Sequence, residues 1–424
     1  MQRSTHTRVL PASVTESGRF EAPAIHTASP EQRHPASMRT PPGRHVAQGA
    51  QGRQRLPGSA HLPKLLAFAL VVSLSATVGA AEGPRKVIVD DDGFGLMHML
   101  LLNAAGVEVL GITEVSGNTW VNRGTASALK GVEAAARTDV PVVPGATYPL
   151  VNSERLTAQW ESMYGRLVWK GAWMKAWAEP TQQPPPPYFG PNDPVMLPGG
   201  NPRTAPADEI AANFLIRMVR AYPGEVTILA TGPMTNLALA QRLDPEFAKL
   251  AKELVYMGGS LRPRRVLDNR SAREFAREFE NTPRREFNIF WDPEAASIVA
   301  RSPWRKITMV PVDPSTATQL TAALKKNLAA AAEPAEAEWV IAREEGFPLW
   351  DEIAAAVWLD PALVTRSETL YVDFDTTFGA GYGNTLSWRE HYQPGLGERL
   401  QQVVISVDTQ RLYARMAHWM AGGP

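Results

Sequence analysis

Short runs of β-branched residues alternate with alanine-rich or amphipathic stretches along the chain from residue 86 onward. The runs that predict strands lie at residues 86–89, 107–113, 140–143, 225–230 and 253–257. The stretches that predict helices lie at residues 97–105, 125–137, 208–222 and 352–359. Strands that alternate with helices are typical of an α/β fold with a mostly parallel central sheet and helices on both faces, a Rossmann-like open sheet.

Residues 151–205 interrupt this alternation. They hold Trp160, Trp169, Trp173 and Trp177 together with a run of four prolines, and their sequence has no strand pattern. Insertions of this length are usually functional loops or irregular excursions. We expect the tryptophans either to pack over a pocket or to fill a core of their own, and both alternatives remain open.

The chain before residue 82 has a different composition. Residues 1–63 are rich in Pro, Ser, Thr, Gln, Arg and Gly, which predicts a disordered or mis-assigned leader. Lys64, a short apolar core and small residues up to Ala81 follow, so residues 64–81 are predicted to be a signal peptide core. The apolar run is shorter than the ~20 residues of a membrane span. We expect a periplasmic or secreted protein; an uncleaved anchor is the alternative, and Met38 is one candidate for a downstream start.

Composition and charge exclude several classes of protein. The 43 Lys and Arg residues balance the 43 Asp and Glu residues, but residues 1–81 carry nine basic and three acidic side chains. The remaining body is therefore mildly acidic, which argues against nucleic acid as a partner. The sequence has no cysteine, which excludes disulfides, thiolate zinc sites and cysteine nucleophiles. After residue 81 the histidines are His98, His391 and His418, so a histidine-rich metal site is not expected.

Oxygen-bearing side chains gather where the predicted strands end and before two later helices. In an open parallel sheet, ligands bind beyond the carboxyl ends of the strands. The side chains at these places are Asp90, Asp91, Asp92, Asn118, Thr231, Glu286, Asn288 and Asp351. Oxygen ligands of this kind are those that Ca²⁺ or Mg²⁺ prefers, and converging acids repel one another unless a cation lies between them. The sequence therefore predicts a divalent metal site.

Two further points concern the orientation of the three aspartates and the role of Asp351. Alternate side chains of an extended strand share a face, so Asp90 and Asp92 are expected to point together and Asp91 to oppose them. Asp351 directly precedes the predicted helix 352–359, a place that is also typical of a helix N-cap. A metal-ligand role and a capping role for Asp351 are both kept.

Five ordered segments resemble the inosine–uridine-preferring nucleoside hydrolase family. The first is the opening strand with its aspartates at 90–92. The others are Ile-Thr-Glu-Val-Ser-Gly-Asn at 112–118, Thr-Gly-Pro-Met-Thr-Asn at 231–236, Tyr-Met-Gly-Gly at 256–259 and Glu-Phe-Asn at 286–288. The resemblance implies a nucleoside hydrolase-like domain over 82–424 that cleaves the N-glycosidic bond of a ribonucleoside or a related N-riboside.

The resemblance also implies roles for single residues. In the family, Ca²⁺ lowers the pKa of a bound water and an aspartate removes its proton. Matching the motif residue by residue makes Asp92 the catalytic base and a metal ligand. Asp351 and the backbone carbonyl of Thr231 would be further ligands of the probable Ca²⁺.

The same resemblance implies which residues bind the sugar, what the substrate is and that the protein forms oligomers. Asn118, Glu286 and Asn288 would hold the hydroxyl groups of the ribose, and so would Glu280 or its neighbour Asn281. The substrate is expected to be a small-molecule nucleoside or N-riboside. Family members are commonly dimers or tetramers, so a homo-oligomer is expected.

The opening motif departs from the family pattern Asp-x-Asp-Pro-Gly-x-Asp-Asp. Leu96 and Met97 stand where its last two acids belong, and neither side chain binds a hard cation. Either Asp91 or a water fills the place after a shift of the chain at Gly93 and Gly95, or the metal is weak or lost. In the second case the protein is a non-catalytic nucleoside- or sugar-binding protein on the same fold.

The group that assists the leaving base also departs from the family. Family members often place a histidine before the late aspartate and another in the loop after the third strand. Here Trp350 takes the first place, and residues 151–205 contain no histidine. Trp350 could stack on a base, and Tyr164 is a candidate proton donor. His98 is expected to be a packing or surface residue, while a position of His391 near the pocket stays open.

Overall fold

The structure is a computed structural model that describes residues 83–178, 187–263, 281–282 and 284–424. The predicted leader 1–63, the signal segment 64–81 and Glu280 lie outside these residues. No helix in the described ranges combines the length and the apolar character needed to cross a bilayer.

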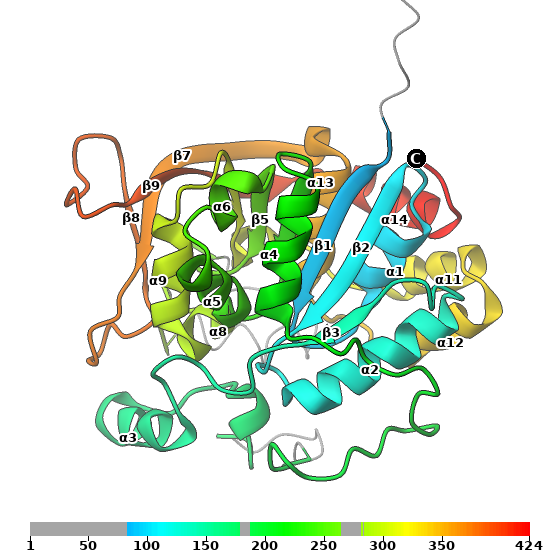
Figure 1. Ribbon diagram of the computed structural model, residues 1–424, viewed down its shortest axis with the longest axis horizontal. Coiled ribbons are helices and arrows are strands. Elements are labelled where there is room, and N and C mark those ends of the chain that lie inside the picture. Colours follow the sequence, from blue (N-terminus) through cyan, green and yellow to red (C-terminus); the bar gives the residue numbers. More distant parts are fainter. Residues whose placement is uncertain (1–82, 179–186, 264–280, 283) are drawn as a thin grey trace, which may run out of the picture. The chain divides into compact units, whose positions relative to one another are not determined.

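A nine-stranded sheet runs through the described chain in the order β3-β2-β1-β4-β5-β6-β9-β7-β8 (Figure 1). Its strands are β1 (Arg85–Asp91), β2 (Val107–Glu114), β3 (Val142–Pro144), β4 (Val226–Ala230), β5 (Glu253–Met257), β6 (Ile307–Val310), β7 (Val364–Phe374), β8 (Thr385–Trp388) and β9 (Arg399–Val407). The strands from β3 across to β9 pair in parallel, whereas β7 is antiparallel to both β9 and β8. The predicted mostly parallel α/β sheet is confirmed.

The parallel strands β1 to β5 form where the apolar runs predicted them, whereas β6 and β9 were not predicted. Val87, Ile88 and Val89 in β1 are almost wholly buried, because a strand in the middle of a parallel sheet is covered on both faces. β3 begins at Val142, later than the pattern predicted, because Pro141 has no N–H group for the ladder.

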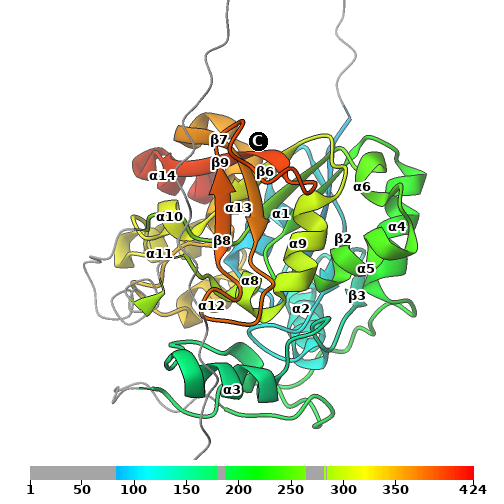
Figure 2. The same cartoon turned by 90° about the vertical axis from the view of Figure 1, so that its left-hand side faces the viewer.

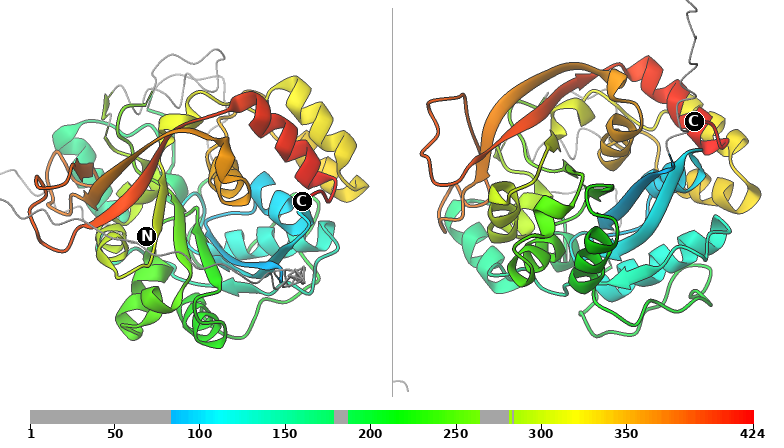
Figure 3. Two further views of the ribbon diagram at one scale, coloured as in Figure 1. Left: turned by 90° about the horizontal axis from the view of Figure 1, so that it is seen from above. Right: turned by 45° about the horizontal axis from the view of Figure 1, so that its top comes forward.

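Helices cover both faces of the sheet. On one face an apolar core joins α1 (Leu96–Asn103), α2 (Val121–Ala134), α11 (Ala322–Ala331), α12 (Pro334–Ala342), α13 (Asp351–Leu359) and α14 (Thr409–Met420). On the other face a second core joins α4 (Ala211–Ala221), α5 (Thr235–Leu243), α6 (Phe247–Leu250) and α9 (Pro293–Arg301). Figure 3 shows the strands between the green helices of the second group and the yellow and red helices of the first.

β1 and β4 are neighbours in the sheet, and the strands that follow each of them are added on opposite sides of this pair. From β1 the chain moves outward through β2 to β3, and it then returns to β4 on the other side of β1. Connections that diverge in this way leave a crevice at the carboxyl ends of the two strands, where open α/β sheets bind ligands. β1 ends at Asp91 and β4 ends at Ala230, so Asp92 and Thr231 are placed at this crevice.

Five further helical elements in the described chain lie outside these two groups. They are α3 (Glu154–Tyr164), η1 (Gly171–Trp173), α8 (Phe287–Trp291), α10 (Val312–Ser315) and η2 (Pro361–Leu363). α3 and η1 belong to the predicted insertion, and α3 lies at the bottom of the view in Figure 2. The indole N–H of Trp160 in α3 donates to the carbonyl of Gly379 at 2.7 Å, which attaches the insertion to the segment between β7 and β8.

Candidate active site

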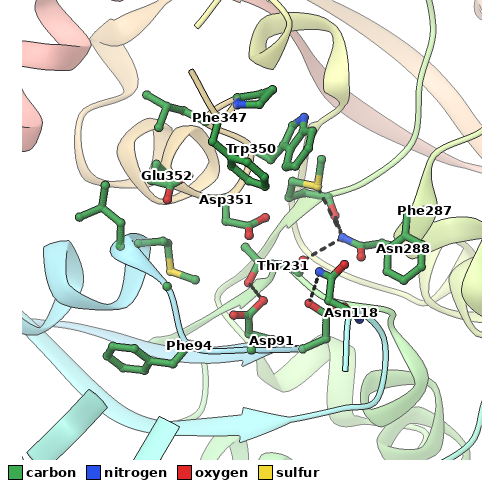
Figure 4. Close-up of a pocket in the computed structure, with 18 of the residues that line it drawn as sticks. Asp91, Phe94, Asn118, Thr231, Phe287, Asn288, Phe347, Trp350, Asp351 and Glu352 are labelled. Atoms are coloured by element: carbon green, nitrogen blue, oxygen red, sulfur yellow. Dashed lines mark hydrogen bonds between the residues drawn. The ribbon is translucent and has the colours of Figure 1, made fainter. Parts of the chain in front are cut away.

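A cavity of about 380 Å³ lies at the carboxyl ends of β1 and β4. The structure brings most of the predicted site residues to its wall, namely Asp91, Asp92, Asn118, Thr231, Glu286, Asn288, Trp350 and Asp351. Figure 4 shows the labelled members of this set converging from separate segments of the chain. The rule that ligands bind beyond the strand ends therefore located the cavity correctly.

The three opening aspartates do not alternate as predicted. Asp91 and Asp92 both line the cavity, whereas Asp90 is fully buried and accepts hydrogen bonds from Thr113 and Asn236. The expected grouping of Asp90 with Asp92 is wrong because β1 ends at Asp91. The chain then bends, so the alternation of an extended strand does not continue to Asp92.

Asn118 holds the carboxylate of Asp92 in place. The backbone N–H of Asn118 donates to Oδ2 of Asp92 at 2.6 Å, and its side-chain Nδ2 donates to Oδ1 at 3.0 Å. Burial raises the pKa of Asp92 to about 6, and these two hydrogen bonds oppose the rise. Asp92 is thus a buried carboxylate with a fixed orientation and a pKa raised toward neutrality, as a general base requires.

Two glycines of the family motifs make room for Asp92. A Cβ atom on Gly117 would lie 2.0 Å from Oδ2 of Asp92, and a Cβ atom on Gly232 would lie 2.8 Å from its backbone nitrogen. Any side chain at Gly117 would therefore displace the carboxylate. Both segments, 112–118 and 231–236, use their glycine for this close approach.

Asn288 and Glu286 lie at the start of α8. Asn288 Nδ2 donates to the Thr231 carbonyl at 2.8 Å, which leaves its side-chain oxygen as the acceptor at the cavity. Glu286 accepts the backbone N–H groups of Asn288, Ile289 and Gly259 and so acts as the N-cap of α8. Its pKa is raised to about 7, mainly by burial. Glu286 therefore has a structural role besides any contact with a substrate.

Asp351 is the first residue of α13 rather than its cap. Trp350 occupies the N-cap position and does not cap the helix through its side chain, so the capping interpretation of Asp351 is wrong. Burial raises the pKa of Asp351 well above its ordinary value, and repulsion from Asp91 is the next largest cause. Its carboxyl group is therefore in electrostatic reach of the acids at the end of β1.

His98 lies in the site as well as in the core. It lines the cavity, stacks on Phe94 at 4.6 Å, and has its Nε2 3.6 Å from Oδ2 of Asp91. Nδ1 accepts the backbone N–H of Gly95, so the ring proton is on Nε2 and faces Asp91. Burial lowers the pKa of His98 to about 3, which keeps the ring neutral. The expected packing role is correct, but a surface position is not.

Several residues of the site were not named from the sequence. Phe287 and Phe347 supply aromatic wall to the cavity. Glu114 at the end of β2 does not line the cavity; it is fully buried, with no hydrogen-bond partner for its carboxylate among the described residues. Burial, followed by repulsion from Asp91, raises its pKa well above the ordinary value. A strand-end acid was a usable signal for Glu114, since the same rule identified the aspartates of β1.

Other predicted residues lie away from the cavity. Asn281 and His391 are exposed and do not line it. Tyr164 is 40% exposed and packs on Trp160, so it is not placed to protonate a leaving group. The tryptophans of the insertion divide between the two predicted roles, because Trp173 stacks on Trp291 in a small core while Trp169 lines the cavity.

The donor set suits a hard divalent cation. Three carboxylates, those of Asp91, Asp92 and Asp351, and the carbonyl of Thr231 are oxygen donors of the kind that Ca²⁺ binds. Within the described ranges, no three acidic or histidine side chains already form a group that could hold a metal. Leu96 and Met97 line the cavity and contribute no donor. A cation would therefore have to draw the carboxylates together.

The fold is that of the nucleoside hydrolases. It aligns with the structure of a plant nucleoside hydrolase at a TM-score of 0.59 and 23% identity, over 80% of this chain and 99% of that one. It aligns with a purine-preferring ribonucleoside hydrolase from Gardnerella vaginalis at a TM-score of 0.57 and 22% identity, over 80% and 98% of the two chains.

The sequence comparisons give the family. The model of the inosine-uridine preferring nucleoside hydrolases matches residues 87–414, so the chain belongs to this family of hydrolases, as the motifs had indicated. An uncharacterised protein of Schizosaccharomyces pombe is 30% identical over 77% of this chain and 82% of its own length. A probable uridine nucleosidase 2 of Arabidopsis thaliana is 32% identical over 52% of this chain and 57% of its own length. An inosine-uridine preferring nucleoside hydrolase of Leishmania major is 29% identical over 58% and 66%.

Proposed function

We propose that the protein hydrolyses the N-glycosidic bond of a ribonucleoside or a related N-riboside. The observation that carries the proposal is the meeting of Asp91, Asp92 and Asp351 in one cavity at the end of β1. Cleavage of this bond builds positive charge on the sugar, and carboxylates on the cavity wall stabilise that charge.

Asp92 is the group that takes the proton from the attacking water. Its carboxylate is fixed by two hydrogen bonds from Asn118, so one lone pair of each oxygen remains for the water. The oxygen of the water bonds to the anomeric carbon, the bond to the base breaks, and the electron pair leaves with the base. Asn118 and the amide oxygen of Asn288 line the same cavity and would orient the sugar hydroxyls.

The base would lie against the aromatic wall. Trp169, Phe287 and Trp350 line the cavity from three separate segments. Any purine or pyrimidine presents a π-face, so stacking on these rings holds a base without selecting one by hydrogen bonds. We therefore expect a broad preference for nucleosides rather than strict selection of one base.

Ca²⁺ is the proposed cofactor. The carboxylates of Asp91, Asp92 and Asp351 and the carbonyl of Thr231 would hold it, and the Thr231 carbonyl keeps a lone pair beside its bond from Asn288. When bound, a divalent ion lowers the pKa of a ligated water and clamps sugar hydroxyls.

The test is release of reducing sugar from a panel of purine and pyrimidine ribonucleosides, with Ca²⁺ and with a chelator. Sugar release that needs Ca²⁺ supports both the activity and the cofactor. Sugar release that persists with the chelator keeps the activity and rejects the ion. No release from any nucleoside under either condition would reject the proposed hydrolysis.

Leu96 and Met97 support one alternative. Because two apolar side chains line the cavity where the family has acids, the fold could bind a nucleoside without cleaving it. Calorimetry separates the two functions: binding with the nucleoside recovered intact favours a binding protein, and recovery of free base and sugar favours the hydrolase.

We also propose export and self-association. Export rests on the signal-like composition of residues 64–81, and fractionation of cells with mass analysis of the mature N-terminus tests it. Association into dimers or tetramers is proposed because these oligomeric states are common in the family. Light scattering on the purified mature protein tests it. A cytosolic full-length chain or a monomer would reject the respective proposal.

A further inference from the structure

One hydrogen bond links the insertion to the residue that holds Asp92. The indole Nε1 of Trp169 donates to Oδ1 of Asn118 at 2.7 Å. On the other side of the same amide, Nδ2 of Asn118 donates to Oδ1 of Asp92 at 3.0 Å. The three side chains thus form a continuous chain from the insertion to the proposed base.

The chemistry of these groups fixes the orientation of the amide. An indole N–H only donates, so the group of Asn118 that faces Trp169 must be its oxygen. The NH₂ group must then face the carboxylate of Asp92, where it stabilises the ionised form. Without the indole N–H, only the carboxylate of Asp92 orients the amide, so the amide is held less firmly.

The segment around Trp169 is docked against the loop that carries Asn118. The backbone N–H of Ala172 donates to the carbonyl of Gly117 at 2.9 Å. Gly171 approaches the same carbonyl so closely that a Cβ atom would lie 2.1 Å from it, and its φ of 55° also favours glycine. The ring of Trp169 contacts Trp177 and Phe287 at centroid distances of 5.8 and 6.5 Å. These contacts set the position from which the indole donates.

We propose that Trp169 is a positioning residue that orients Asn118 and, through it, Asp92, so that docking of the insertion is a condition for rapid hydrolysis. The inference rests on the proposed function, because it assigns Trp169 to the base of that reaction. It gives the insertion a part in the chemistry that is separate from stacking on the substrate.

The variant Trp169→Phe tests the hydrogen bond while it keeps an aromatic ring at the cavity. We expect kcat to fall about fivefold to tenfold, as for loss of one hydrogen bond in the transition state, with KM changed less than about twofold. Trp160→Phe is the matched control, because it removes an indole N–H bond of the same 2.7 Å length from the same insertion to the carbonyl of Gly379. This control is expected to keep the wild-type kcat.

A double-mutant cycle with Asn118→Ala tests whether Trp169 acts through Asn118. In that background Trp169→Phe should lower kcat no further, because the amide that it orients is gone. An unchanged kcat in Trp169→Phe alone, or a full additional loss in the Asn118→Ala background, overturns the proposal.

A second readout does not depend on activity. In protein labelled with ¹⁵N-asparagine, the side-chain NH₂ signals of Asn118 should shift or broaden in Trp169→Phe and stay in place in Trp160→Phe. If the wild type releases sugar from no nucleoside, the proposed function fails, while these signals still decide the link. Unmoved Asn118 signals in Trp169→Phe contradict the link even when the enzyme is active.

Discussion

Burial governs the chemistry of single acids in the cavity. It is the largest cause of the raised pKa values of Asp92 and Glu286, about 6 and about 7, and of the rise at Asp351. Repulsion between neighbouring carboxylates adds to it, as between Asp351 and Asp91. Acids held together at this cost attract a cation, which restores the charged form of each.

Calcium affinity should depend on Asp351 far more than on its neighbour. Asp351→Asn is expected to weaken Ca²⁺ binding by at least about tenfold, since it removes a carboxylate coupled to Asp91. Glu352→Gln is the matched control, because Glu352 also lines the cavity and repels Asp351, but it faces the charge of Arg343 and is not a proposed ligand. The control should bind Ca²⁺ within about twofold of the wild type. Titration calorimetry measures both, and equal losses in the two variants would contradict the proposed ligand set.

The sequence predicted those residues of the site whose position depends only on where a strand ends. The ends of the predicted strands were sufficient to group Asp92, Asn118 and Thr231, although the paths of the loops between them were not known. Trp169 could not be placed, because its contact with Asn118 depends on the path of an irregular insertion. The direction of Asp92 was missed for a simpler reason, since the bend after β1 cannot be seen in the residues alone.

Among the elements, prediction succeeded for the buried strands β1 to β5 but missed the equally buried β6. β1, β4 and β5 are continuous apolar runs inside a parallel sheet, and such runs are visible in the sequence. No strand was predicted over 364–407, where β7, β8 and β9 lie. β7 carries polar and exposed residues along its first half, so its pattern resembles that of a loop.

We expect Asp292 to anchor the loop that ends at Leu150, just before the insertion, to α9. This side chain caps α9 through the N–H of Ala295 and also accepts the Leu150 N–H and the Thr235 hydroxyl. Asp292→Ala is therefore expected to lower the free energy of unfolding by about 2–4 kcal/mol, since it removes a cap and leaves buried donors unpaired.

Asp408→Ala provides the matched comparison for that loss. Asp408 caps α14 through Arg411 but is exposed, so about 0.5–1 kcal/mol is expected from the cap alone. Denaturant unfolding measures both variants. If the two losses are equal, Asp292 is only a cap and does not fasten the loop.

For the molecule as a whole, buried acids should make stability depend on pH. The pKa of Glu286 is about 7 in the folded chain against an ordinary value of 4.5. Between these values the native state binds more protons than the unfolded state, so the free energy of unfolding falls as pH rises. In the presence of a chelator, Glu286→Gln should make this fall shallower across pH 4.5 to 7, as followed by urea unfolding. A slope equal to that of the wild type would show that Glu286 ionises freely in the folded chain.

The central claim is that Asp92, held by Asn118 at the end of β1, activates the water that cleaves an N-riboside. The most direct measurement is kcat for sugar release by Asp92→Asn beside the wild type, with unfolding curves to show that both are folded. We expect kcat to fall by about 10²- to 10⁴-fold while the fold persists, since an amide of the same shape cannot take the proton. A folded Asp92→Asn that releases sugar at the wild-type rate would contradict the account.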